Sequence, residues 1–134
     1  DIYNNIGVIY KKLRQFDQAI DINPEYAKPF NNIGVVYYAK KDFKGAIRNY
    51  QKASSIDPEN LEALNNLAVA YKRTGQLERA KTVLNQALVI NPAHAGTHYN
   101  LAVVYEGEGN IKSAIHFYQN FVELVSASHP KLSV

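Results

Sequence analysis

The 134-residue sequence contains no cysteine. This absence excludes disulfide scaffolds, thiolate zinc sites, iron–sulfur clusters and cysteine nucleophiles, but proteins of either redox environment can lack cysteine, so no compartment follows. No apolar run approaches the ~20 residues that a membrane-spanning helix needs. Charge of one sign is also in short supply, because 15 Lys and Arg against 12 Asp and Glu leave a net charge of only +3. With 46% hydrophobic residues, the chain is too apolar for disorder and typical of a folded protein.

The sequence begins at Asp1, and residues 1–5 read as the interior of a helix. We therefore expect a piece of a longer chain. No signal segment is visible, but a trimmed start removes the meaning of that absence. The localisation stays open.

A repeat with a period of 34 residues runs through the chain. Three tripeptides mark it: Ile22-Asn23-Pro24, Ile56-Asp57-Pro58 and Ile90-Asn91-Pro92. Between these markers the apolar residues are three and four apart, which predicts two amphipathic helices in each period. The order of residues in the three complete units is Phe30-x2-Ile33-Gly34-x2-Tyr37 with Ala46-x3-Tyr50, Leu64-x2-Leu67-Ala68-x2-Tyr71 with Ala80-x3-Leu84, and His98-x2-Leu101-Ala102-x2-Tyr105 with Ala114-x3-Tyr118.

These residues resemble the tetratricopeptide repeat, a helix–turn–helix of 34 residues. The resemblance covers nearly the whole chain and implies an all-α fold, a right-handed α-solenoid of antiparallel helix pairs. Because one pair cannot bury its own apolar face, neighbouring pairs stack to form the core. We expect helices at 27–40 with 43–56, 61–74 with 77–90, and 95–108 with 111–127. The predicted organisation is a single solenoid domain, 1–134, with repeats at about 1–26 (incomplete), 27–60, 61–94 and 95–128, and residues 129–134 as a tail or the start of a further helix.

The first repeat is seven residues short. Gly7 and Gly34 are 27 residues apart, where the later equivalents are 34 apart, and the deficit falls between Ile20 and Asp21. Either the natural chain lacks two helical turns, or seven residues are missing from the printed sequence. We favour the second explanation, because a stub would expose the core of a terminal repeat.

One asparagine recurs at the same place in each first helix, and we expect these side chains on the concave face: Asn5, Asn32, Asn66 and Asn100. A valine follows one turn later, at Val35 and Val69 among others. An Asn amide offers a donor and an acceptor, so it can bind a peptide backbone without reading its sequence. The ladder resembles that of the superhelical repeats in O-linked N-acetylglucosamine transferases, which implies an extended polypeptide ligand. The alternative is that Asn only helps to pack the helix start.

Four further side chains are predicted on the same face. Tyr38 and Tyr99 supply apolar contacts, and Lys72 and Arg73 suit a partner with acidic segments. The alternative for the two cations is a solvated helix end, where positive charge complements the helix dipole.

Chaperone-binding members of the family clamp a peptide carboxylate with Lys and Arg beside the ladder. Here Asn31 and Asn65 precede the ladder residues, and Val35 and Val69 follow them. We therefore do not expect this chain to bind heat-shock-protein tails.

No constellation for catalysis or for a cofactor is present. His94 and His98 are four apart, but no carboxylate accompanies them in a metalloprotease arrangement, so we expect structural roles and no metal. His116 and His129 have no Ser–acid partner at a suggestive spacing. The basic residues near Lys44 are interrupted by Asp42, which does not favour nucleic acid. We expect no enzyme activity.

The sequence therefore predicts a non-catalytic protein–protein interaction scaffold that binds a peptide segment in its concave groove. The alternative is a self-assembling or domain-swapped module that uses its uncapped ends. For that alternative, Phe117, Phe121 and Leu124 are the expected exposed apolar residues near the C-terminus.

Overall fold

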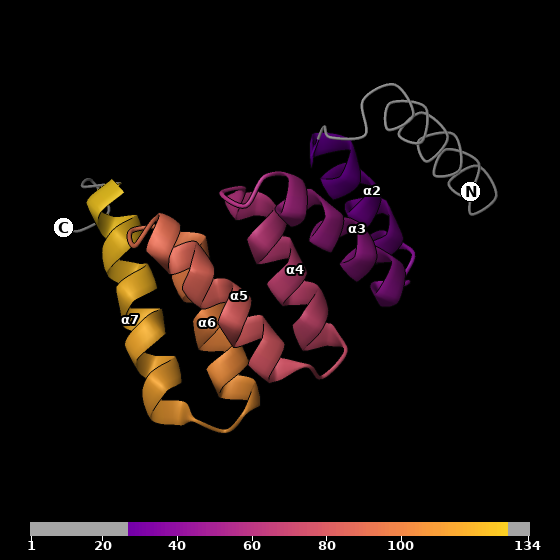
Figure 1. Cartoon of the computed structure of the whole chain (residues 1–134). Coiled ribbons are helices and arrows are strands. Elements are labelled where there is room, and N and C mark those ends of the chain that lie inside the picture. The colour runs from indigo at the N-terminus through magenta and orange to yellow at the C-terminus, as the bar shows by residue number, and fades with distance from the viewer. Residues whose placement is uncertain (1–26, 129–134) are drawn as a thin grey trace, which may run out of the picture.

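The computed structural model describes residues 27–128, and within that range the chain is entirely helical apart from its short connections. The helices pair as three antiparallel hairpins, α2 with α3, α4 with α5 and α6 with α7 (Figure 1). Their bounds are α2 Ala27–Ala39, α3 Phe43–Ile56, α4 Leu61–Arg73, α5 Leu77–Ile90, α6 Ala95–Gly107 and α7 Ile111–Ser128. The expected all-α solenoid is confirmed, and each of these helix ends lies within one residue of its prediction. The questions about repeat 1–26, the Ile20–Asp21 junction and residues 129–134 lie outside the described residues.

The turn inside each hairpin has the same backbone conformation. Lys41, Gly75 and Gly109 occur once per period and have φ angles of 65°, 78° and 82°. This left-handed conformation ends the first helix, and it suits glycine because glycine has no Cβ. Lys41 therefore adopts the same turn at a steric cost that the two glycines avoid.

Side-chain caps set where several helices begin. The Asp42 carboxylate accepts from the amide of Gly45 at 2.9 Å, and Asn60 Oδ1 accepts from the amide of Ala63 at 3.0 Å. Each cap satisfies a backbone donor that has no partner inside its own helix. At the start of α6 this role belongs to His94, whose Nδ1 accepts from the amide of Thr97 at 3.2 Å.

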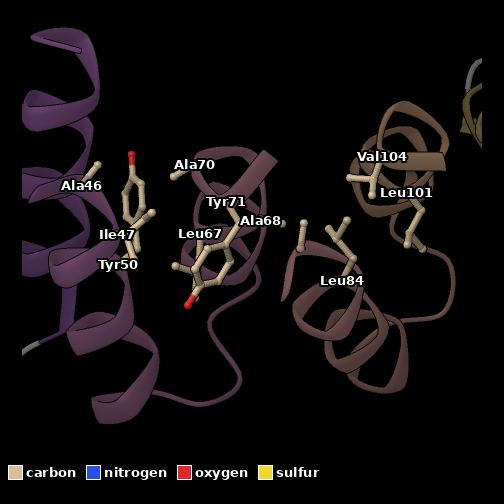
Figure 2. Packing of buried hydrophobic residues seen from close by; sticks show 11 residues of the cluster. Ala46, Ile47, Tyr50, Leu67, Ala68, Ala70, Tyr71, Leu84, Leu101 and Val104 are labelled. Atoms are coloured by element: carbon tan, nitrogen blue, oxygen red, sulfur yellow. The ribbon is translucent and has the colours of Figure 1, made fainter. Parts of the chain in front are cut away.

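The core is shared between hairpins. Apolar side chains from α3, α4, α5 and α6 form one cluster, which includes Tyr50, Leu67, Leu84 and Leu101 (Figure 2). The helices of a hairpin approach closely, because an added Cβ on Gly34 would lie 2.5 Å from the ring of Tyr50. The cluster crosses the hairpin boundaries, so stacking supplies the core that no single hairpin has.

The order of helix contacts gives the solenoid its curvature. α4 touches both α2 and α6, whereas within residues 27–128 the second helices α3, α5 and α7 do not contact one another. The first helix of each pair therefore lies on the tighter, inner side of the stack. We call the surface made by α2, α4 and α6 the concave face.

Candidate functional site

The predicted asparagine ladder lies on the three first helices. Asn32, Asn66 and Asn100 are each half-buried, on α2, α4 and α6 respectively. The fourth predicted member, Asn5, lies outside the described residues.

A second row of asparagines, one residue earlier, holds the ladder in place. The Nδ2 group of Asn66 donates to Oδ1 of Asn31 at 3.1 Å. The Nδ2 group of Asn100 donates in the same way to Oδ1 of Asn65 at 2.9 Å. Each of these bonds joins a first helix to the one before it. The ladder is therefore partly a structural link between repeats, and part of its hydrogen-bonding capacity is already used.

The orientation of the Asn100 amide follows from its neighbours. Asn65 Nδ2 donates to the carbonyl oxygen of Leu61 at 2.9 Å and to Oγ1 of Thr97 at 3.0 Å. A carbonyl oxygen only accepts, so the Asn65 amide must face Leu61 with its nitrogen and Asn100 with its oxygen. Asn100 must then present its nitrogen to Asn65. Its own Oδ1 receives no donor from the described residues, so Asn100 has an acceptor available for a ligand.

A pocket of about 240 Å³ opens beside Asn100 on this face. We call it the central pocket. It brings together six of the residues predicted from the sequence: Tyr38, Val69, Lys72, Arg73, Tyr99 and Asn100. The remaining lining residues are Ala68, Leu84, Val103 and Val104. Its floor is therefore apolar, and its polar groups come from the ladder, the two cations and the tyrosine hydroxyls.

The other predicted residues lie outside the central pocket. Val35 on α2 is 46% exposed, and neither Val35, Asn32 nor Asn66 lines the pocket. The predicted site thus divides into a pocket centred on α4 and α6 and an open stretch along α2.

The central pocket has a positive electrostatic character. Lys72 and Arg73 line it, and no acidic side chain does. The guanidinium of Arg73 lies over the ring of Phe43 at 5.1 Å, a favourable cation–π contact. Tyr38 packs edge-on against the same ring at 5.1 Å. Phe43 thereby positions two of the lining residues, and Lys72, half-buried, has no ion-pair partner among the described residues.

Sequence reasoning missed the residues that orient the ladder. Asn31 and Asn65 bear on it directly, and Thr97 fixes Asn65. The signal for the first two was the Asn-Asn doublet at 31–32 and again at 65–66. Thr97 gave no signal, because its partner is 32 residues away and the contact depends on how α4 and α6 are rotated.

The histidines have structural roles. His94 caps α6, and His98 is buried, donating from Nε2 to the carbonyl oxygen of Pro92 at 2.8 Å. The ring of His98 also packs against Phe117, with centroids 5.8 Å apart. Within residues 27–128, no three His, Cys, Asp or Glu side chains are grouped to hold a metal ion. Nor does that stretch include a helix long and apolar enough to span a membrane.

Family models match most of the chain. The model described as TPR repeat matches residues 36–75 and 70–109, and the model described as tetratricopeptide repeat matches residues 1–22 and 95–124. The chain belongs to the tetratricopeptide repeat family. Scaffolds of this family are generally non-catalytic and serve protein interaction. No curated relative matches the chain significantly.

Solved structures share this repeat architecture. MamA is similar over 94% of this chain and 74% of its own, with a TM-score of 0.83 and 17% identity. MamA from Desulfovibrio magneticus RS-1 gives a TM-score of 0.81 with 21% identity, over 94% of this chain and 71% of its own. The first TPR of Spaghetti (RPAP3), bound to the HSP90 peptide SRMEEVD, gives 0.71 with 23% identity, over 74% of this chain and 79% of its own. At these identities the likeness shows the fold.

Proposed function

We propose that this repeat domain is a non-catalytic scaffold that binds a peptide segment of a partner protein on its concave face. The observation that carries the proposal is the central pocket, where six residues selected from the sequence meet around an apolar floor. The solved repeat of Spaghetti (RPAP3), a structural neighbour, holds a peptide, which supports the same class of ligand here.

The size of the central pocket favours one anchoring side chain. Small-molecule sites usually have volumes of about 300–1,000 Å³, and an apolar cavity of about 150 Å³ can hold benzene. The 240 Å³ pocket therefore fits one large aliphatic or aromatic side chain. The peptide backbone continues along the ladder, where Oδ1 of Asn100 accepts a backbone N–H.

The charge around the central pocket favours an acidic segment. Lys72 and Arg73 are in the last turn of α4, close to the apolar floor. A carboxylate near the anchoring side chain would pair with Lys72 and offset the cost of its partial burial. The clamp of heat-shock-tail binders is missing here, since Asn65 and Val69 flank Asn66. An internal acidic segment therefore fits better than a free C-terminus.

Peptide selection on the full chain tests this function. We expect dodecapeptides selected from a random phage-displayed library to share a large apolar residue near Asp or Glu. In calorimetry with a selected peptide, Asn100→Ala and Lys72→Glu should each weaken binding at least tenfold. Lys44→Glu, on the exposed surface of α3, is the matched charge control and should leave affinity unchanged. Failure to select any peptide, or equal binding by all variants, would contradict the proposal.

Self-assembly is the second candidate function, and exposed apolar residues on α7 favour it. The exposed large side chains there are Ile111, Ile115 and Val122. The expectation that named Phe117, Phe121 and Leu124 chose the wrong face of the helix. Phe117 stacks on Tyr105 at 5.5 Å against the core, and Phe121 packs on Tyr99 at 5.3 Å.

A further inference from the structure

One face of α7 carries a row of apolar side chains that the rest of the described chain leaves open. Ile111, Ile115 and Val122 are 55%, 51% and 58% exposed, and Tyr118 and Val125 are half-buried. These five residues are alternately four and three apart, the spacing of the contact seam in a two-helix coiled coil. We call this row the α7 seam. It lies on the helix at the end of the stack (Figure 1).

The equivalent face of the earlier second helices is buried between repeats. Ile47 and Tyr50 on α3 occupy the places of Ile115 and Tyr118, and they are only 9% and 3% exposed. Both belong to the core cluster that includes Leu67 of α4. The fold therefore uses this helix face as a helix–helix interface, and on α7 the interface has no second helix among the described residues.

A first helix of the ordinary kind does not fit the α7 seam. Where α3 has Ala53 and α5 has Ala87, both 0% exposed, α7 has Phe121. Ala53 packs in one cluster with Ala63 of α4, so the next helix comes close at that small residue. On α7 the Phe121 ring occupies this place, against Tyr99. The helix that covers the α7 seam must therefore lie differently from α4 and α6.

We propose that the α7 seam packs against the same seam of a second copy of this chain, with the two helices antiparallel. This proposal rests on the second candidate function and names its surface. A seam that meets its own copy is self-complementary, as a twofold interface requires. In the antiparallel register Ile115 lies opposite Val122 of the second copy. Tyr118 and Gln119 lie at the twofold axis.

Charge selects the antiparallel direction. Lys112 and Glu123 lie on the same side of the α7 seam, near its opposite ends, and neither forms an ion pair within the described residues. In the antiparallel pair, each Lys112 lies level with Glu123 of the second copy. In a parallel pair, lysine would face lysine and glutamate would face glutamate. Complementary charges at such flanking positions set orientation in coiled coils.

Oligomeric state tests the surface. We expect the full chain to sediment as a dimer that dissociates on dilution. Ile115→Glu and Val122→Glu should each abolish the dimer, with the helical circular dichroism retained because both side chains are exposed. The matched control Val89→Glu adds the same charge at a position 85% exposed on α5 and should leave the dimer intact. A monomer at all concentrations would overturn this proposal and the second candidate function together. A dimer unaffected by both seam variants would overturn the α7 seam alone.

Direction is tested by two single cysteines, because the chain has none of its own. Gln119→Cys lies near the twofold axis and should form a disulfide-linked dimer on oxidation. Ile111→Cys lies opposite Val125 of the second copy. The two introduced cysteines are then ~14 helical residues, about 21 Å, apart, too far for a disulfide. Cross-linking by Ile111→Cys would show a parallel pair and overturn the proposal.

Charge reversal gives a second readout of direction. Lys112→Glu alone should weaken the dimer several-fold, because it brings two glutamates level. Combining it with Glu123→Lys should restore the affinity. Absence of any restoration would contradict the Lys112–Glu123 pairing, and peptide binding at the central pocket should be unchanged throughout.

Discussion

Lys41 holds a backbone conformation that glycine holds in the two equivalent turns. Its φ angle of 65° places it in the left-handed region, beside 78° and 82° for Gly75 and Gly109. That conformation costs a residue with a Cβ about 1–2 kcal/mol, whereas glycine costs about 0.5–1 kcal/mol more than alanine in ordering entropy. We expect Lys41→Gly to raise the free energy of unfolding by ~0.5–1 kcal/mol in urea titration. A decrease would mean that the Lys41 side chain stabilises the turn.

Gly34 is small because Tyr50 lies against it. A Cβ at Gly34 would be 2.5 Å from the Tyr50 ring, which is itself buried. The ring must then shift within a packed core, which costs about 1–3 kcal/mol. We expect Gly34→Ala to lower the free energy of unfolding by that amount.

Gly107→Ala is the matched control for this substitution. Gly107 is also in a first helix, but a Cβ added there would meet no atom within 4 Å. Alanine has the better helix propensity by up to ~1 kcal/mol, so this variant should be neutral or slightly more stable. Equal losses for both variants in urea titration would contradict the role assigned to Tyr50.

At the scale of single residues, the sequence located much of the candidate site but not its hydrogen bonds. Val69, Lys72 and Asn100 were predictable because a 34-residue period assigns each a place on a first helix. The bond from Asn100 to Asn65 depends on the distance and rotation between α4 and α6. Those are properties of packing, and no local pattern encodes them.

Helix positions were the most predictable feature of the fold. They follow from local signals, namely apolar spacing, the left-handed turns and the prolines that follow α3 and α5. The central pocket was less predictable, since its walls come from α2, α4, α5 and α6. Leu84 lines it from a second helix, where the sequence pattern indicated only a core position.

The packing of α3 between α2 and α4 makes stability depend on alkaline pH. Burial raises the pKa of Tyr50 to about 12, and the nearby Tyr38 and Glu62 add to the effect. The unfolded chain loses the Tyr50 proton near pH 10, before the folded chain does, so the folded state loses stability from about pH 10 to about 12. We expect this loss to be smaller in Tyr50→Phe.

The difference between the parent and Tyr50→Phe isolates this contribution from other groups that titrate at high pH. Thermal unfolding of both proteins should give similar pH dependence below about pH 9 and diverge above about pH 10, with Tyr50→Phe losing less. Parallel curves over the whole range would show that Tyr50 does not titrate differently in the folded and unfolded states.

The molecule as a whole is a row of helices in which stability depends on neighbours. In such a repeat array, each unit contributes its own stability and its interfaces with the units beside it. α4 contacts α2, α3, α5 and α6, whereas α7 contacts only α6 within the described residues. The burial of side chains agrees, since seven residues of α4 are buried but only Ala114 of α7.

Hydrogen exchange should reproduce this gradient. We expect the amides of α4 to be protected most strongly, at or near the free energy of global unfolding, and those of α7 to exchange faster through local opening. If α7 pairs with a second copy, its protection should rise with protein concentration and that of α4 should rise less. In the Ile115→Glu variant the concentration dependence should disappear. Protection of α7 equal to that of α4 in this variant would contradict the neighbour-dependent account, because a helix with one neighbour would then be as stable as one with four.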